Sequence, residues 1–220
     1  LSEAALRPVQ AAVLHYADPA AGLTIIEAPT GEGKSETGGF QAARGCALRG
    51  KQGIYFALPT AATSNQMFRR INNMLSTLHL GGARLMHGMA WLAGKDDGQA
   101  NAALEDRQDV CDWLRPLRRA MLAENAVGTA DQAMMAAMPI RYGCLRMLGL
   151  MGKVLVIDEI HAYDAYMSEI IERLLEWCHA LRIPVVLLSA TLTTQKRKRL
   201  VEAYGGKLEK ASAAYPLITQ

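Results

Sequence analysis

The 220-residue sequence lacks paired cysteines, a secretory signal and a long apolar run. Its four cysteines lie far apart with no Cys-x-x-Cys pair, which argues against a zinc knuckle and a dense disulfide framework. We expect buried, reduced thiols at Cys46, Cys111, Cys144 and Cys178. The start has no basic stretch followed by an apolar run, and no later segment has the length of a transmembrane span. These absences favour a cytoplasmic protein without a membrane partner.

A strong charge bias is also absent. The 24 lysines and arginines stand against 21 acidic residues, which gives a formal net charge of +3. Contact with nucleic acid would therefore depend on a local arrangement of groups and not on the field of the whole molecule. Half of the residues are hydrophobic and a fifth are charged, as in globular proteins. The length favours one domain, at roughly 100 to 200 residues per domain.

Short apolar runs rich in β-branched residues alternate with helical patterns along the chain. The runs predict buried strands at 24–28, 53–58, 83–87, 154–159 and 185–190, with a weaker candidate at 126–129. The helical patterns cover 34–48, 61–78, 108–122 and 167–181. This alternation predicts an α/β fold, a parallel sheet with helices on both faces, whose ligands bind beyond the carboxyl ends of the strands. Residues 93–109, rich in Gly, Asp, Asn and Gln, predict a flexible surface insertion.

A glycine-bearing segment, 29–35, connects the first predicted strand to the first predicted helix. Gly31 and Gly33 permit a tight turn whose N–H groups point toward one spot, where the N-terminus of the helix adds positive charge. Strand, turn and helix in this order predict a phosphate site for ATP. Lys34 is expected to reach the β- and γ-phosphates, and the Ser35 hydroxyl to bind Mg²⁺. The predicted cofactor-binding residues of this loop are Pro29, Thr30, Gly31, Glu32, Gly33, Lys34 and Ser35.

Two carboxylates, Asp158 and Glu159, end the apolar run that begins at residue 154. Buried acidic groups normally need cationic or metal partners. We expect Asp158 to hold Mg²⁺ and Glu159 to orient the water that attacks the γ-phosphate. The predicted catalytic residues are Lys34, Asp158, Glu159 and His161. The hydroxyls of Ser189 and Thr191, after the last strand, are expected to bond to the acidic segment and couple the nucleotide state to domain movement.

Each of these motifs also has a plainer interpretation. Ala28 stands where the stricter phosphate-loop pattern has a glycine, so a glycine-bearing turn before an amphipathic helix fits segment 28–35 alone. The acidic pair alone fits a strand-to-helix turn with Asp158 as the helix cap. His161 either reports the phosphate state to a nucleic-acid site or makes one ordinary hydrogen bond. The four cations at 196–199 fit a solvated helix face better than a nucleic-acid patch.

The order of the motifs resembles the first half of a superfamily 2 helicase. The segments that carry the resemblance are LRPVQ (6–10), APTGEGKS (28–35), ALPT (57–60), VGTADQ (127–132), DEIH (158–161) and LSAT (188–191). The resemblance implies a RecA-like P-loop NTPase domain in which Gln10 reads the adenine edge of ATP. It also implies nucleic-acid backbone contacts, which suit a motor that steps over any sequence. The residues expected to make them are Pro59, Thr60, Asn65, Gly128 and Thr129.

The sequence is most similar to the CRISPR-associated helicase-nucleases of type I systems, in particular the type I-E branch. Asp131–Gln132 and the string HAYDAYM (161–167) carry this closer resemblance. It implies ATP-driven 3′-to-5′ movement on single-stranded DNA and recruitment by a Cascade-type surveillance complex. It also implies an N-terminal HD nuclease domain and a second RecA-like lobe that ATP hydrolysis requires. Residues 1–220 would then be the first RecA-like lobe, a piece of a longer protein, as the initial leucine also suggests.

Two other functions stay open at this point. One is the motor domain of a different superfamily 2 helicase, such as an RNA helicase or a restriction translocase. The other is a nucleotide-gated docking module without turnover. Stimulation of ATP hydrolysis by DNA rather than RNA would separate the motors, and turnover in the full-length protein would exclude the docking module.

Overall fold

The computed structural model describes residues 6–77, 82–86, 121–209, 212 and 214–220. The predicted insertion at 93–109, most of the predicted helix at 108–122 and Cys111 lie outside these residues. Within the described part, no helix is long and apolar enough to cross a membrane.

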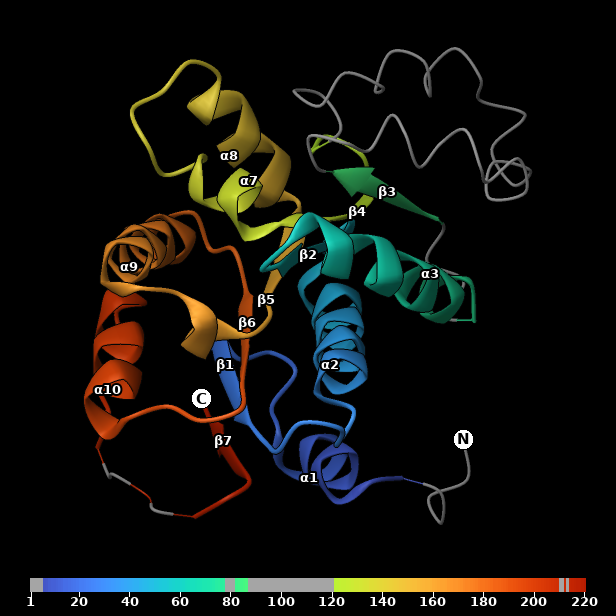
Figure 1. The fold of residues 1–220 in the computed structure, drawn as a ribbon, viewed down its shortest axis with the longest axis vertical. Coiled ribbons are helices and arrows are strands. Elements are labelled where there is room, and N and C mark those ends of the chain that lie inside the picture. The colour runs from blue at the N-terminus through green and yellow to red at the C-terminus, as the bar shows by residue number, and fades with distance from the viewer. Residues whose placement is uncertain (1–5, 78–81, 87–120, 210–211, 213) are drawn as a thin grey trace.

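The described strands form one sheet of seven, in the order β3-β4-β2-β5-β6-β1-β7 (Figure 1). Their bounds are β1 Leu23–Glu27, β2 Gly53–Leu58, β3 Ala83–Met86, β4 Asn125–Thr129, β5 Lys153–Ile157, β6 Val185–Ser189 and β7 Leu217–Thr219. All neighbours pair in parallel except β7, which pairs antiparallel with β1 at one edge. The weaker strand prediction at 126–129 is confirmed as β4, whereas β7 was not predicted.

Helices cover both faces of the sheet, as predicted. The described helices are α1 Pro8–Tyr16, α2 Lys34–Arg49, α3 Ala61–Thr77, α7 Ala130–Met134, α8 Gly143–Met151, the 3₁₀ helix η3 Ile160–Ala162, α9 Ala165–Ala180 and α10 Thr194–Ala203. The first three pack on one face and α7 to α10 on the other, as the positions of α2 and α9 in Figure 1 show. The prediction of an α/β fold is therefore confirmed, although α1, α7 and α8 were not predicted and α10 was expected only around residues 196–199.

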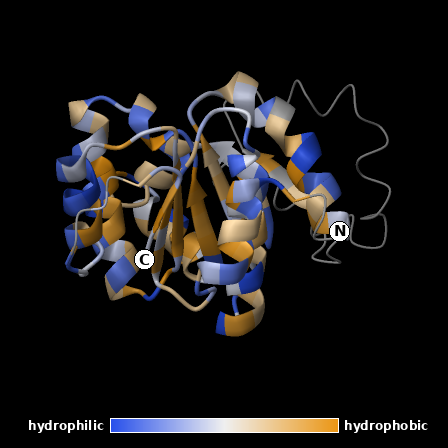
Figure 2. Ribbon diagram, turned by 90° about the horizontal axis from the view of Figure 1, so that it is seen from below, coloured by the Kyte–Doolittle hydropathy of each residue, from blue (hydrophilic) through white to orange (hydrophobic). Residues whose placement is uncertain are grey.

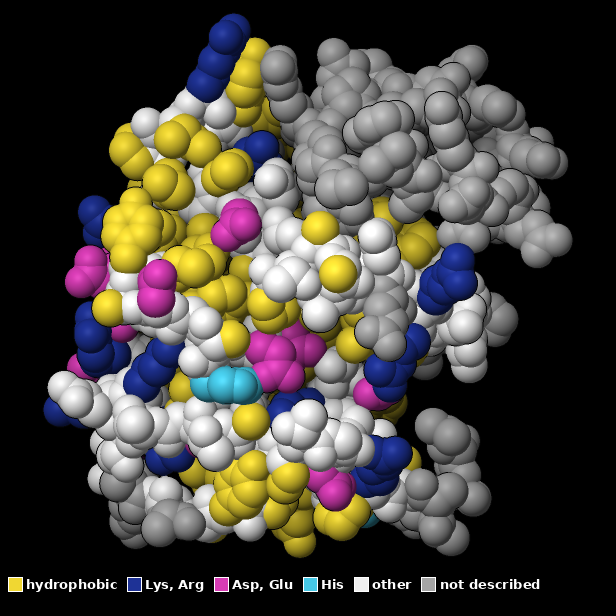
Figure 3. Space-filling view, viewed as in Figure 1, with side chains coloured by type: hydrophobic (Ala, Val, Ile, Leu, Met, Phe, Trp, Pro, Cys, Tyr) yellow, Lys and Arg dark blue, Asp and Glu magenta, His cyan; other side chains and the backbone are white. Residues whose placement is uncertain are grey.

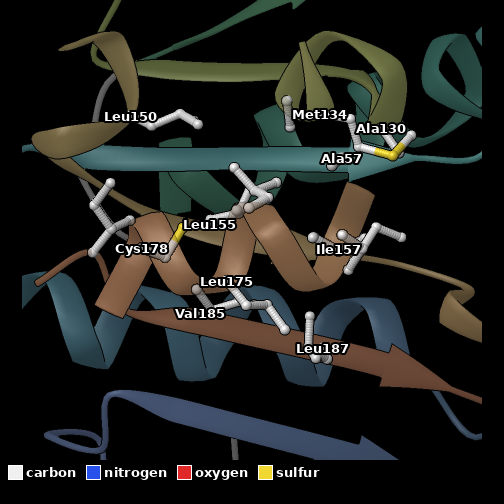
Figure 4. Close-up of a cluster of buried hydrophobic side chains, with 14 of the residues drawn as sticks. Ala57, Ala130, Met134, Leu150, Leu155, Ile157, Leu175, Cys178, Val185 and Leu187 are labelled. Carbon is white, nitrogen blue, oxygen red and sulfur yellow. The ribbon is translucent and has the colours of Figure 1, made fainter. Parts of the chain in front are cut away.

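Successive side chains along a strand point to opposite faces of the sheet. In β2, Ile54 and Phe56 belong to the core beneath α2, while Tyr55 and Ala57 belong to the core beneath α7 and α9. All four are at most 2% exposed, because a parallel sheet between two helix layers buries both sides of each strand. Figure 2 shows the resulting apolar strands at the centre, and Figure 4 shows the side chains of β5 and β6 packed against Leu175 and Cys178 of α9.

The structure corrects three local predictions. Strand β5 ends at Ile157, two residues early, because Glu159 has the left-handed φ of 55° and turns the chain. Helix α9 begins at Ala165 and not at 167, since the Asp164 side chain caps it by accepting the Met167 N–H. The expectation of buried thiols is confirmed for Cys46 and Cys178 but is wrong for Cys144, which is exposed.

Candidate nucleotide-binding site

The predicted site residues meet at one edge of the sheet. Strands β1, β2, β4, β5 and β6 run parallel, so their carboxyl ends share that edge. The phosphate-loop segment follows β1, the acidic segment follows β5, and the segment of Ser189 to Thr191 begins at the end of β6. Figure 3 shows acidic side chains next to a histidine near the middle of the face that it presents. The topology thus brings together residues that are more than a hundred positions apart in the sequence.

The segment between β1 and α2 has the backbone of a phosphate cradle. Gly31 and Gly33 have φ of 88° and 74°, the left-handed conformation that glycine adopts without strain. Helix α2 then begins at Lys34, so its free N–H groups face the turn. Pro29, Thr30 and Gly31 are exposed, while Glu32 and Gly33 are half-buried. This part of the chain offers main-chain donors and a positive helix end to an anion.

Lys34 and Gln10 lie against this turn. The Lys34 ammonium is buried and donates to the Ala28 carbonyl at 2.9 Å. Ala28, which replaces a glycine of the stricter pattern, is buried and does not have a positive φ, so the fold does not require glycine there. The amide nitrogen of Gln10 lies 2.9 Å from where a Cβ on Gly33 would stand, and its oxygen accepts the Arg7 N–H. A side chain at position 33 would therefore displace the end of Gln10, and it would also have to adopt a positive φ.

Ser35 and Asp158 are in direct contact across the site. The Ser35 hydroxyl donates to Asp158 Oδ2 at 2.6 Å, and the Glu159 N–H donates to Oδ1 at 2.8 Å. Burial raises the pKa of Asp158, while the Ser35 hydrogen bond acts against that rise. A hydroxyl and a carboxylate so close together, beside a phosphate cradle, form the oxygen-rich donor set that Mg²⁺ favours. The residues present therefore fit Mg²⁺ bound to a nucleotide.

A chain of hydrogen bonds connects the acidic segment to the end of β6. His161 Nδ1 accepts the Ala190 N–H at 3.2 Å and lies 3.3 Å from Ser189 Oγ. An Nδ1 that accepts a hydrogen bond leaves the proton of the neutral ring on Nε2, which lies 3.2 Å from Glu159 Oε2. Thr191 takes part through its carbonyl, which accepts the Ser189 hydroxyl at 3.0 Å. His161 thus contacts both the acidic segment, through Glu159, and the end of β6, through Ser189 and Ala190. A turn histidine that makes one ordinary hydrogen bond would not connect these two segments.

The residues expected to contact nucleic acid divide into two groups. Thr60 and Asn65 are exposed and Pro59 is half-buried, all at or near the start of α3. The Thr60 hydroxyl accepts the Thr63 N–H at 3.2 Å and so caps that helix. Gly128 and Thr129, in contrast, are buried at the end of β4. Direct contact of these two with nucleic acid stays a prediction that the structure does not favour.

Sequence reasoning missed one pair of residues beside the site. Glu27, the last residue of β1, forms a buried ion pair with Arg197 of α10, with Arg197 Nε 2.6 Å from Glu27 Oε1. The interpretation of 196–199 as a solvated face is therefore wrong for Arg197, which is 5% exposed. Lys196 is half-buried and donates to the Ile160 carbonyl at 3.0 Å, whereas Lys198 forms an exposed ion pair with Glu202 and Arg199 forms one with the half-buried Glu172. An acidic residue in an otherwise apolar strand was the signal that could have revealed the pair.

The fold and this site together define a P-loop nucleotide-binding domain of the helicase type. The family model "DEAD/DEAH box helicase" matches residues 7–200, nearly the whole chain. The chain belongs to the DEAD/DEAH box helicase family.

Known CRISPR-associated proteins are among its relatives. The chain is 37% identical over 196 residues to the CRISPR-associated endonuclease/helicase Cas3 of Thermus thermophilus, which covers 84% of this chain and 21% of that protein. The crystal structure of T. fusca Cas3 with AMPPNP superposes with a TM-score of 0.84 at 36% identity, over 99% of this chain and 25% of that one. A chain in a structure titled "CRISPR RNA-guided surveillance complex, pre-nicking" matches with a TM-score of 0.65 at 33% identity, over 94% of this chain and 21% of that one.

These similarities confirm the resemblance drawn from the sequence and the fold class that it implied. The chain spans about a fifth of the length of the curated relative and a quarter of the T. fusca protein. What a whole relative does is therefore a matter of proposal for this chain.

Proposed function

We propose that residues 1–220 form the first RecA-like lobe of a CRISPR-associated helicase that uses ATP to move 3′-to-5′ along single-stranded DNA. The observation that carries the proposal is the 2.6 Å contact between Ser35 and Asp158 beside the glycine-bearing turn. It joins the two ligands that a nucleotide-bound Mg²⁺ requires from such a lobe. In this proposal an HD nuclease domain and a second RecA-like lobe, in the same or a separate chain, complete the machine.

The chain's own groups divide the binding of ATP among them. Main-chain N–H groups of 31–35 and the Lys34 ammonium bind the phosphates, and Lys34 exchanges its contact with the Ala28 carbonyl for the phosphate oxygens. Gln10, which lies against Gly33, is the residue proposed to read the adenine edge of ATP. Ser35 and Asp158 hold Mg²⁺, which when bound neutralises charge on the phosphate oxygens.

Glu159 is the residue proposed to orient and polarise the attacking water. Its carboxylate lies 3.2 Å from His161 Nε2, whose N–H fixes the direction of that carboxylate. His161 contacts Ser189 and the Ala190 amide, so the orientation of Glu159 depends on the end of β6. We propose that the second lobe completes the catalytic arrangement, so that hydrolysis by this chain alone is slow.

The path proposed for DNA runs over the start of α3. A helix N-terminus capped by an exposed threonine attracts phosphate without reading bases, which suits a motor that steps over any sequence. Pro59, Thr60 and Asn65 form this surface, and Gly128 and Thr129 lie in the neighbouring strand β4. The DNA is delivered, in this proposal, by a Cascade-type complex, which the similarity to a chain in a surveillance-complex structure supports.

ATP hydrolysis in the full-length protein that contains this lobe tests the proposal. We expect single-stranded DNA to stimulate turnover strongly and RNA of the same sequence to do so weakly. Glu159→Gln should retain ATP binding and lose turnover, and Asn65→Ala should weaken the stimulation by DNA without changing ATP affinity. Equal stimulation by RNA would favour an RNA helicase, and no turnover under any condition would favour a docking module.

A further inference from the structure

The strand that leads into the phosphate loop ends in a buried carboxylate with three donors. Arg197 Nε lies 2.6 Å from Glu27 Oε1, Arg197 Nη2 lies 3.1 Å from Oε2, and the Leu192 N–H donates to Oε2 at 3.0 Å. The side chains of Glu27 and Arg197 are 3% and 7% exposed. This two-pronged arrangement fixes the carboxylate in one orientation.

The same strand end is attached to segment 189–192 at a second point. The Ala28 N–H donates to the Ser189 carbonyl at 3.2 Å, directly after Glu27. Segment 189–192 is therefore held at its start by the main chain of Ala28 and at its end by the side chain of Glu27. Ser189 and Ala190, at the start of this segment, contact His161.

Helix α10 holds both nucleotide-site segments through its first turn. Arg197 binds Glu27, before the phosphate loop, and Lys196 donates to the Ile160 carbonyl, after the acidic pair. The Thr193 hydroxyl caps the helix by accepting the Lys196 N–H. One helical turn thus connects the ends of β1 and β5 to the segment that follows β6.

Stability alone gives a weak reason for an ion pair at this position. A buried ion pair can often be replaced by apolar residues of similar volume without loss of stability, because desolvation offsets the attraction of the charges. What apolar residues cannot supply is an acceptor for the Leu192 N–H. What the Glu27–Arg197 pair provides, and an apolar pair would not, is therefore a fixed position for segment 189–192.

We propose that Glu27 and Arg197 are positioning residues that hold segment 189–192 against the strand before the phosphate loop, and so transmit nucleotide binding to the His161 contacts. The inference rests on the proposed binding of ATP by this lobe. When Lys34 binds phosphate in place of the Ala28 carbonyl, Ala28 loses a hydrogen bond, and Ala28 is the residue next to Glu27. A displacement of the Glu27 carboxylate would move Leu192, which is hydrogen-bonded to it. Segment 189–192 would then shift relative to His161, which contacts Ser189 and Ala190.

The test uses a double substitution that separates position from stability. Glu27→Leu with Arg197→Met removes both charges and the Leu192 acceptor together but keeps apolar volume. The matched control is Lys198→Met with Glu202→Leu, which removes an exposed ion pair within α10 whose charged atoms lie 3.7 Å apart. Thermal unfolding checks the fold, titration with a non-hydrolysable ATP analogue and Mg²⁺ measures affinity, and hydrogen exchange resolves the amides of 190–193 with and without the analogue.

In the parent and the control, we expect the analogue to slow exchange across 190–193. In the Glu27→Leu/Arg197→Met variant the analogue still binds, the Leu192 amide exchanges about tenfold faster because a hydrogen bond to a charged group is lost, and the response of 190–193 to the analogue disappears. If the double variant does not fold, Arg197→Lys retains the charge but loses the two-pronged contact, and it should reduce the response by about half or more.

The inference would be overturned if the analogue slowed exchange at 190–193 in the folded double variant as it does in the parent. If the double variant does not fold, the same result in Arg197→Lys would overturn it. Glu27 and Arg197 would then have a structural role alone. A parent that binds the analogue without any change at 190–193 would also overturn the inference while the ATP site stands. A parent that binds no analogue at all would refute the proposed function, and the inference with it.

Discussion

Two substitutions at the contact between Ser35 and Asp158 are expected to change stability in opposite directions. Asp158 is 3% exposed, and its pKa is raised chiefly by burial. A raised carboxyl pKa means that the folded protein holds the proton more tightly than the unfolded chain does. At pH 7 the charged Asp158 therefore destabilises the fold.

Asp158→Asn removes this charge and should increase the free energy of unfolding at pH 7 without nucleotide. Ser35→Ala leaves the carboxylate buried without the hydroxyl that donates to it at 2.6 Å. A hydrogen bond to a charged group contributes about 1.5 to 3 kcal/mol, so Ser35→Ala should lower the free energy of unfolding by about that amount.

Urea unfolding at pH 7 measures both changes, with equal m-values as the check that the two states are unaltered. Titration of ATP with and without Mg²⁺ should show that each variant loses the Mg²⁺-dependent part of the affinity. A shift of stability in the same direction in both variants, or an Mg²⁺ response retained by Asp158→Asn, would contradict these roles of Ser35 and Asp158.

Two further predictions concern residues away from the phosphates. Burial lowers the pKa of Lys153 to about 8, so the unfolded chain holds that proton more tightly and the parent should gain up to about 3 kcal/mol as pH rises from 8 toward 10.5. In Lys153→Met, the free energy of unfolding measured across this pH range should not show that increase. A pH dependence equal to the parent's would contradict the lowered pKa of Lys153 as its cause. Asp164→Ala removes the cap on α9 and should cost about 1 kcal/mol of stability with unchanged ATP affinity; a weaker affinity would mean that Asp164 acts on the site.

The strands and the phosphate loop could be predicted because their signals are local. Each buried parallel strand is a short apolar run, and the turn that follows β1 needs glycine at Gly31 and Gly33, where φ is positive. The acidic pair was predicted for the same reason, since two carboxylates directly follow the apolar residues of β5. Patterns within a few residues were enough for these features.

Contacts between distant parts of the chain could not be predicted from such patterns. Glu27 and Arg197 lie 170 positions apart, and only the order of the strands brings them together. Strand β7 has three residues and exists because β1 offers it an edge. Helix α8 was missed because its apolar residues cover much of its surface and Gly149 interrupts the helical pattern. These features depend on tertiary packing, which outweighs local preference.

Calorimetric titration of ATP and Mg²⁺ into this chain and its Lys34→Ala variant measures whether the segment between β1 and α2 binds the nucleotide. We expect the parent to bind, and the variant, without the ammonium that contacts Ala28 at 2.9 Å, to bind about 10- to 100-fold more weakly while remaining folded. Equal affinity of the two proteins, or no binding by the folded parent, would contradict this expectation.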